Sequence, residues 1–242
     1  MSIGQQNSGV NGIGISWKNL IKSWLSCKNY EKRTNFLADD LMLIQIPKNV
    51  ENLSLPDPSL VSFYKELERR TVWIDGEVDI NCLEIERYIL NFNKEDVGKP
   101  VEERTPIKLM LFTPGGDLDV NNSLIQLIML SKTPVWAVNM GVAQSSGAFV
   151  FLACHKRLAM PKSVFLLHQG SASMAGTHEQ IEQVTTEYKR QISELTDFVE
   201  RRTKMPRKTI ANKIRKEWFV GADEALELGI CDKIVDSIEE LL

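Results

Sequence analysis

Near-continuous apolar runs recur in the second half of the chain. Three of them, Ile107–Phe112, Val135–Asn139 and Ser163–Leu167, end at polar or turn-forming residues. Such runs are typical of strands that lie fully buried in a parallel sheet. A shorter run rich in β-branched and aromatic residues, Thr71–Ile74, ends at Asp75-Gly76 and predicts a further strand.

Between these runs, apolar residues recur at intervals of three and four, which predicts amphipathic helices. The predicted helices span residues 59–69, 81–93, 119–131, 145–154, 178–203, 209–217 and 222–228, with Gly229 as the cap of the last one. Strands that alternate with helices indicate an α/β fold with a mostly parallel sheet. The helix over 178–203 is the longest, and its apolar stripe predicts a partner surface outside its own subunit.

The N-terminal part of the chain differs in composition from the rest. Residues 1–15 are rich in Gly, Asn, Ser and Gln, and residues 16–68 carry apolar patches and a Pro-Asp-Pro break at 56–58. We therefore predict a partly disordered N-terminal extension over residues 1–63, of unknown function. The remaining residues, 64–242, are predicted to form one domain that carries the chemistry.

Composition and charge narrow the classes of function. The net charge is −3, so electrostatics gives no reason to expect a nucleic acid as partner. The four cysteines stand at no spacing typical of metal ligands, and we expect neither a metal nor an organic cofactor. The apolar stretch 135–154 contains Asn139, Gln144, Ser145 and Ser146, which argues against a membrane span. With no signal-peptide pattern, we expect a cytoplasmic protein.

Three polar segments follow the predicted strands and carry candidate chemistry. Thr113–Asp117 holds two glycines whose backbone N–H groups could face an oxyanion, although Gly-Gly alone also fits an ordinary turn. Gly141–Ala148 places Ser145 and Ser146 at a helix start, where a serine is either an N-cap or an exposed nucleophile. His168 ends the next strand. A serine at a turn, followed by a histidine that ends the next strand, is the arrangement that nucleophilic catalysis needs.

Four motifs in this order resemble the ClpP peptidase family, the proteolytic subunits of Clp proteases. They are Phe112-Thr-Pro-Gly-Gly116, Gly141-Val-Ala-Gln-Ser-Ser-Gly-Ala148, Leu166-Leu-His-Gln169 and the C-terminal stretch from Phe219 to Ile234. The resemblance covers residues 64–238 and is that of a divergent member. It implies an α/β fold of the ClpP/crotonase type, with repeated β-β-α units, a protruding handle helix and a divergent N-terminal extension.

The resemblance also implies roles for individual residues. Ser145 corresponds to the nucleophile and His168 to the general base of a serine endopeptidase. Glu217 stands where the family has the aspartate that orients the histidine. The backbone N–H groups of Gly116 and Ser146 correspond to the oxyanion hole. Substrate binding is implied for residues of the glycine loop and of a small-residue segment that would pair with an extended peptide, namely Gly115, Gly170, Ser171, Ala172 and Ser173.

The same resemblance implies an assembly. The chain would form a homo-oligomeric ring of seven subunits, single or stacked as a double ring, with the helix over 178–203 as the handle. An AAA+ unfoldase would feed unfolded proteins and peptides to active sites inside the ring. Nothing in the resemblance implies a metal, a cofactor, a nucleic acid or a membrane.

Departures from the family pattern leave alternatives open. The nucleophile turn carries Val142 and Gln144, Cys154–Arg157 replaces a Gly-containing turn, and Glu217 replaces the aspartate. One alternative is a catalytically weak or inactive ClpP-like ring subunit. Another is a crotonase-type enzyme acting on CoA thioesters, which shares the fold but would leave the serine and histidine without a role. A processing protease from a phage or plasmid would suit the N-terminal extension.

Overall fold

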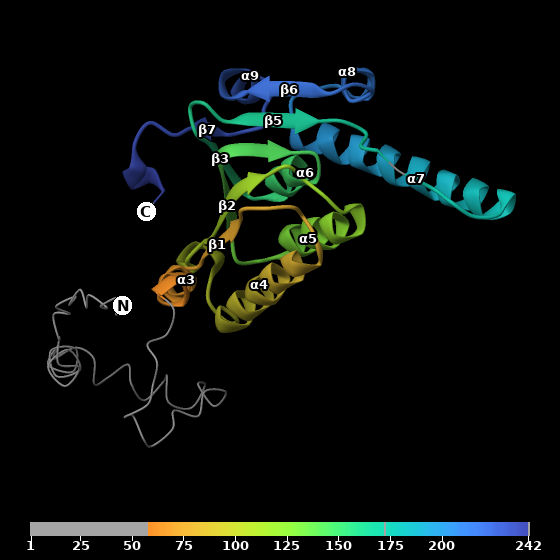
Figure 1. Ribbon diagram of the computed structural model, residues 1–242. Helices are drawn as coiled ribbons and strands as arrows, with labels where there is room; N and C mark the ends of the chain where they lie inside the picture. The colour runs from red at the N-terminus through yellow and green to blue at the C-terminus, as the bar shows by residue number, and fades with distance from the viewer. Residues whose placement is uncertain (1–57, 172, 242) are drawn as a thin grey trace, which may run out of the picture. The chain divides into compact units, whose positions relative to one another are not determined.

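The computed structural model describes residues 58–171 and 173–241, which form one α/β unit (Figure 1). Its first half contains α3 (Pro58–Glu68), β1 (Thr71–Ile74), α4 (Leu83–Glu95), β2 (Ile107–Thr113), α5 (Leu118–Leu130), β3 (Val135–Gln144) and α6 (Ser146–Ala153). Its second half contains β4 (Lys156–Ala159), β5 (Val164–Leu167), α7 (His178–Arg202), α8 (Arg207–Lys213), β6 (Trp218–Gly221), α9 (Ala222–Glu227) and β7 (Lys233–Ile234). Three short 3-10 helices are interspersed, η2 (Ile80–Cys82), η3 (Val101–Glu103) and η4 (Ile238–Glu240). The α/β prediction is confirmed.

The strands form one sheet that forks at β3. Along its main path the order is β1-β2-β3-β4-β7, and every neighbouring pair on this path is parallel. The first half of β3 (136–139) pairs with β4, whereas its last three residues (142–144) pair with β5. Strand β6 then adds to β5 in the antiparallel direction. The fork therefore brings β5 and β6 to the carboxyl end of β3.

A buried asparagine holds the sheet together at the fork. Asn139 is fully buried, and its side-chain amide donates to the Val164 carbonyl at 3.1 Å. Its side-chain oxygen accepts from the Gly141 N–H at 3.1 Å, and its backbone carbonyl accepts from Met160 at 3.1 Å. These bonds satisfy backbone groups that a splitting ladder leaves without strand partners, and an unpaired buried group would be destabilising.

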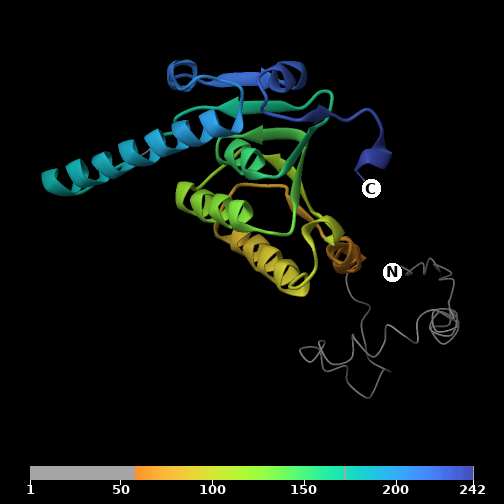
Figure 2. The ribbon, with the colours of Figure 1, turned by 180° about the vertical axis from the view of Figure 1, so that it is seen from behind.

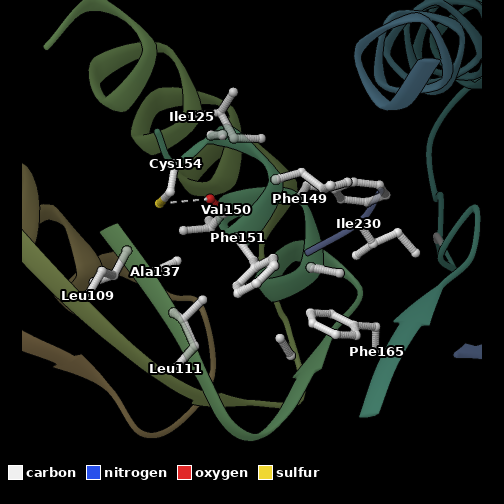
Figure 3. Packing of buried hydrophobic residues seen from close by; sticks show 14 of the residues in the cluster. Leu109, Leu111, Ile125, Ala137, Phe149, Val150, Phe151, Cys154, Phe165 and Ile230 are labelled. Atoms are coloured by element: carbon white, nitrogen blue, oxygen red, sulfur yellow. Dashed lines mark hydrogen bonds between the residues drawn. The ribbon is translucent and has the colours of Figure 1, made fainter. Parts of the chain in front are cut away.

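The main core lies between one face of the sheet and helices α4, α5 and α6. Alternate residues of β2 and β3 face these helices, and α6 is buried along its whole length. The rings of Phe151 on α6 and Phe165 on β5 lie 4.8 Å apart between centroids (Figure 3). The opposite face carries a smaller cluster, formed by Met110, Val138, Leu158 and Val235. Since α6 begins directly after Ser145, this packing fixes the position of that residue.

Helix α7 runs from the sheet into a long projection (Figures 1 and 2). Leu195 and Val199, near its C-terminal end, are buried against the core. Towards its N-terminus the same stripe is uncovered, with Ile181 38% and Val184 52% exposed. The prediction that this stripe is only partly buried within its own subunit agrees with these values.

Several predicted element bounds were wrong. Strand β3 continues five residues beyond Asn139, to Gln144, because the fork supplies β5 as a second partner. The turn expected at Cys154–Arg157 leads into β4, whose charged residues have specific partners. The Lys156 ammonium lies 4.0 Å from the centre of the Trp136 ring, and Arg157 pairs with Asp232. The helix expected over 209–217 covers Arg207–Lys213, and β6 and β7 were not foreseen.

The structure also bears on the predicted domain boundary, the cysteines and the membrane question. The predicted boundary between residues 63 and 64 falls inside α3 and stays a prediction, and the extension before residue 58 lies outside the described residues. Cys82, Cys154 and Cys231 are free and buried. Among the helices of the described residues, none combines the length and the apolar character that a bilayer crossing requires.

Candidate active site

The carboxyl ends of three parallel strands meet at one edge of the sheet. Thr113 at the end of β2 pairs with Ala143 of β3, and Gln144 of β3 pairs with Leu166 of β5. The loop Thr113–Asp117, Ser145 and His168 each follow one of these strands. Parallel pairing therefore brings together the three polar segments that the sequence had singled out.

Ser145 occupies a strained turn between β3 and α6. Its φ is +49° and its ψ is −122°, a region that a residue with a Cβ rarely adopts. The Ser145 N–H donates to the Leu166 carbonyl at 2.8 Å, so the turn is tied to β5. A tight strand-to-helix turn of this kind holds the serine hydroxyl at the sheet edge rather than in the helix cap.

Ser145, His168 and Glu217 form a continuous chain of hydrogen bonds. The Nε2 atom of His168 lies 2.8 Å from Ser145 Oγ, and its Nδ1 atom lies 2.9 Å from Glu217 Oε1. With the ring proton on Nδ1, Nε2 accepts from the serine hydroxyl and the carboxylate accepts from Nδ1. The side chain of His168 is 19% exposed, and that of Glu217 is 59% exposed. The site is therefore open to solvent at its carboxylate end.

Antiparallel pairing of β6 with β5 brings Glu217 to the histidine. Leu167 pairs with Trp218, so the next residues outwards on the two strands are His168 and Glu217. The helix predicted over 209–217 would have made Glu217 a solvated residue of a helix. Glu217 is exposed to solvent but is not helical, because α8 ends at Lys213 and Glu217 lies just before β6.

The glycine loop packs directly against the serine turn. A Cβ atom at Gly115, whose φ is +95°, would lie 2.6 Å from the Ser145 Cβ. At Gly116 it would lie 2.3 Å from the Val78 carbonyl oxygen. Only glycine fits these close approaches. Within the described residues, neither the Gly116 N–H nor the Ser146 N–H donates to a protein acceptor, so both can serve an incoming oxyanion.

The segment after His168 is held from two sides. The Gln169 N–H donates to the Ile214 carbonyl at 2.9 Å, and the Tyr188 hydroxyl of α7 donates to the Gln169 carbonyl at 2.7 Å. Burial raises the pKa of the Tyr188 phenol above its ordinary value. Gly170, at φ +79°, then turns the chain into an irregular stretch that includes Ser171 and Ser173. Ala172 lies outside the described residues.

A small apolar hollow adjoins the histidine and was not predicted as part of the site. Its walls come from α6, α7 and the end of α8, and include Phe149, Ile192, Leu195, Val199 and Ile214 beside His168. The stripe of α7 was visible in the sequence as helical periodicity, but periodicity does not show which residues face a site. The described residues contain no group of His, Cys, Asp and Glu side chains that could hold a metal ion.

Comparison with known proteins assigns the chain to a family. A sequence model described as Clp protease matches residues 60–238. The chain belongs to the Clp protease family. The resemblance found in the sequence is thereby confirmed, and the chain is a divergent member of the ClpP-type peptidase family.

Relatives in the Clp protease family are distant but extensive. The ATP-dependent Clp protease proteolytic subunit 2 of Treponema pallidum is 29% identical over 184 residues, which cover 75% of this chain and 89% of that protein. The proteolytic subunit 3 of Rhizobium meliloti is 32% identical over 137 residues, covering 56% of this chain and 70% of the relative. A solved ClpP1 mutant from Listeria monocytogenes superposes with a TM-score of 0.64 at 21% identity, covering 75% of this chain and 99% of that one. This last similarity shows the Clp protease fold.

Proposed function

We propose that this protein is a serine endopeptidase subunit of the Clp protease type. The observation that carries the proposal is the hydrogen-bonded chain from Ser145 through His168 to Glu217. Family membership supports a peptidase rather than a crotonase-type CoA-thioester enzyme, and such a thioester enzyme would leave the serine–histidine pair without a role. The substrates are peptides and unfolded proteins.

The proposed reaction begins with attack of Ser145 Oγ on a peptide carbonyl carbon. His168 Nε2 accepts the serine proton, and Glu217 stabilises the imidazolium that forms on the other side of the ring. Collapse of the tetrahedral intermediate transfers that proton to the leaving amine and gives an acyl-enzyme. Water then attacks the ester with His168 as the base, which releases the second product and restores the serine.

The oxyanion is stabilised in this proposal by the Gly116 and Ser146 backbone N–H groups. Both lie beside Ser145 and are without protein acceptors in the described residues. Gly170, Ser171 and Ser173, which belong to no strand within the described part of the chain, would pair with an extended substrate strand together with Ala172.

Assembly and partners are part of the proposal. The Treponema pallidum relative is named a proteolytic subunit of an ATP-dependent protease. We extend this to a homo-oligomeric ring of seven subunits, served by an AAA+ unfoldase, with α7 as the handle. The uncovered stripe on α7 supports a contact with another subunit. Three free, buried cysteines suit a reducing compartment such as the cytoplasm.

One observation favours a second candidate, a ring subunit with little activity of its own. Glu217 is 59% exposed, and solvent weakens its electrostatic effect on His168. Labelling of the purified, assembled protein with a fluorophosphonate probe separates the two candidates. An active peptidase is modified at Ser145 alone, and peptide mapping identifies the site. A folded oligomer that reacts with no probe would contradict the peptidase proposal and support the inactive subunit.

Substitution of Glu217 tests whether its carboxylate orients the histidine. We expect Glu217→Gln to lower kcat by roughly 10- to 100-fold with little change in KM, since an exposed carboxylate contributes less than a buried one. Glu217→Asp, which restores the family residue with a shorter reach, should retain more activity than Glu217→Gln. Steady-state kinetics on a fluorogenic peptide give both constants. Glu224→Gln, at an exposed position of α9, is the matched control. Equal rates for wild type, the two Glu217 variants and Glu224→Gln would show that Glu217 is a surface residue with no role in catalysis.

A further inference from the structure

The glycine loop (Thr113–Asp117) and the serine turn (Gln144–Gly147) are in contact at several residues. A Cβ atom at Gly147 would lie 2.3 Å from Thr113 Cγ2, and the Thr113 hydroxyl accepts from the Gly115 N–H at 3.1 Å. Gly115 in turn lies against Ser145. The Ser146 hydroxyl donates to the Gly116 carbonyl at 2.9 Å. The position of the loop is therefore set by the first turn of α6.

The direction of the Gly116 N–H follows from the hydrogen bonds of its own peptide unit. The Gly115 carbonyl belongs to that unit and accepts from the Val78 N–H at 2.9 Å. Because the peptide is planar and trans, the Gly116 N–H points the opposite way, away from the Val78 N–H. The Asp117 N–H donates to the Val78 carbonyl at 2.7 Å and holds the far end of the loop.

Only one side chain of the serine turn bonds to the Gly116 carbonyl. Gly115 and Gly116 have little intrinsic preference for this conformation, because they lack Cβ atoms. The backbone bonds to Val78 hold the loop from the side of the sheet. The hydroxyl of Ser146, a residue only 3% exposed, holds it from the side of the nucleophile. Without that bond, the peptide that follows Gly116 is held, among the described residues, only by the Asp117 N–H bond to Val78, and none of them holds its carbonyl on the side of Ser145.

We propose that the Ser146 hydroxyl is a positioning group that holds the Gly116 N–H in the orientation in which it binds the oxyanion. Ser146 then serves the site twice, with its backbone N–H as a donor and with its side chain as the anchor of the other donor. This inference rests on the proposed peptidase function. It also gives a physical reason for two adjacent serines in the turn.

A positioning role and a merely structural role make different predictions. A donor that is aimed at the oxyanion acts in the transition state and much less in the ground state. Loss of its aim therefore lowers kcat and leaves KM nearly unchanged. A hydrogen bond that only stabilises α6 would lower the melting temperature and leave the kinetics of the folded protein intact.

The test compares full-length wild type, Ser146→Ala and Ser146→Thr. We expect Ser146→Ala to lower kcat about tenfold, the effect of one hydrogen bond, with KM within about twofold. The affinity for a peptide boronate, whose tetrahedral adduct places an oxygen in the oxyanion site, should fall by a similar factor. Ser146→Thr keeps the hydroxyl and should recover most of the loss. Ser163→Ala is the matched control, since Ser163 is also buried and its hydroxyl has no hydrogen-bond partner in the described residues.

The outcomes are distinct. Unchanged kcat and boronate affinity in folded Ser146→Ala would overturn the positioning role, as would a rise in KM alone. Should Ser146→Ala fail to fold, Ser146→Cys keeps the volume with a weak donor, and its kcat decides in the same way. A wild-type protein without activity or labelling would instead contradict the proposed function itself.

Discussion

Ser145→Ala is expected to lower peptidase activity by roughly 10⁴- to 10⁶-fold, to the residual level that binding and oxyanion contacts alone provide. The reason is geometric, because the Ser145 hydroxyl is the one bonded to His168 Nε2, at 2.8 Å. The neighbouring Ser146 hydroxyl bonds to a backbone carbonyl and cannot reach the same proton acceptor in this arrangement. Hydrolysis of a fluorogenic peptide by the assembled protein measures the loss, and gel filtration checks that assembly is unchanged.

The same position allows a second measurement, of stability. Ser145 holds a φ of +49° that glycine adopts more readily than any residue with a Cβ. Ser145→Gly should therefore unfold at a temperature no lower than Ser145→Ala, although glycine normally destabilises through the entropy of the unfolded chain. Ser146→Ala completes the series, and we expect it to lose about tenfold in activity rather than 10⁴-fold. An active Ser145→Ala beside a dead Ser146→Ala would mean that the nucleophile is the other serine.

The parts of the fold that the sequence predicted are those with a local signal. Apolar runs such as Ile107–Phe112 and the long stripe of α7 mark their elements because burial imposes a periodicity on neighbouring residues. Strand β6 has only four residues with alternating burial and follows a charged loop, so it carries little local signal. Strand β4 begins with Lys156 and Arg157, which contact the Trp136 ring and the Asp232 carboxylate, and neither partner lies in the same local segment.

The residues of the candidate site likewise differ in whether the local sequence predicts them. Ser145 and His168 each follow a recognisable buried strand, and parallel strands bring their carboxyl ends together. Glu217 has no such marker, and its approach to His168 depends on the antiparallel pairing of β5 with β6 across 49 positions of sequence. The hollow beside the histidine was missed for a related reason, because its lining comes from three helices whose packing no short segment determines.

A buried ion pair at the other end of the sheet was also not predicted from the sequence. Asp96 lies between the predicted helix over 81–93 and the predicted strand Ile107–Phe112, yet it is fully buried. Arg70 donates to both of its oxygens, with Nη2 at 3.0 Å from Oδ1, and Thr133 donates to Oδ2 at 3.0 Å. The Lys99 ammonium lies 2.8 Å from Oδ1. The carboxylate thus joins β1, α4 and the loop before β3.

Asp96→Ala is expected to destabilise the protein by about 3 kcal/mol, because it removes the buried carboxylate from the guanidinium of Arg70 and leaves it, within the described residues, only the exposed Glu95 carboxylate and the Thr105 carbonyl. Arg70 also holds a left-handed backbone conformation, with φ at +55°, which the ion pair helps to maintain. For a domain of this size the loss corresponds to a melting temperature roughly 10 °C lower. Urea unfolding at constant protein concentration measures the free energy of unfolding of wild type and variant. Asp223→Ala, at an exposed position, should change this free energy by less than about 0.5 kcal/mol.

The pH dependence of this effect has a definite sign. Hydrogen bonds from Arg70, and secondarily from Lys99 and Thr133, hold the pKa of Asp96 well below its ordinary value despite burial. Because the folded pKa is depressed, the stabilisation is complete above the unfolded pKa of about 3.9 and is lost as the pH falls below it. The difference in free energy of unfolding between wild type and Asp96→Ala should therefore be constant from pH 8 to pH 6 and become smaller below about pH 4.

A double-mutant cycle tests the same ion pair. The loss of stability in the double variant Arg70→Ala/Asp96→Ala should be clearly smaller than the sum of the losses in the two single variants. Additive losses and a gap that does not change with pH would show that the buried pair contributes little, and that Asp96 matters only through packing.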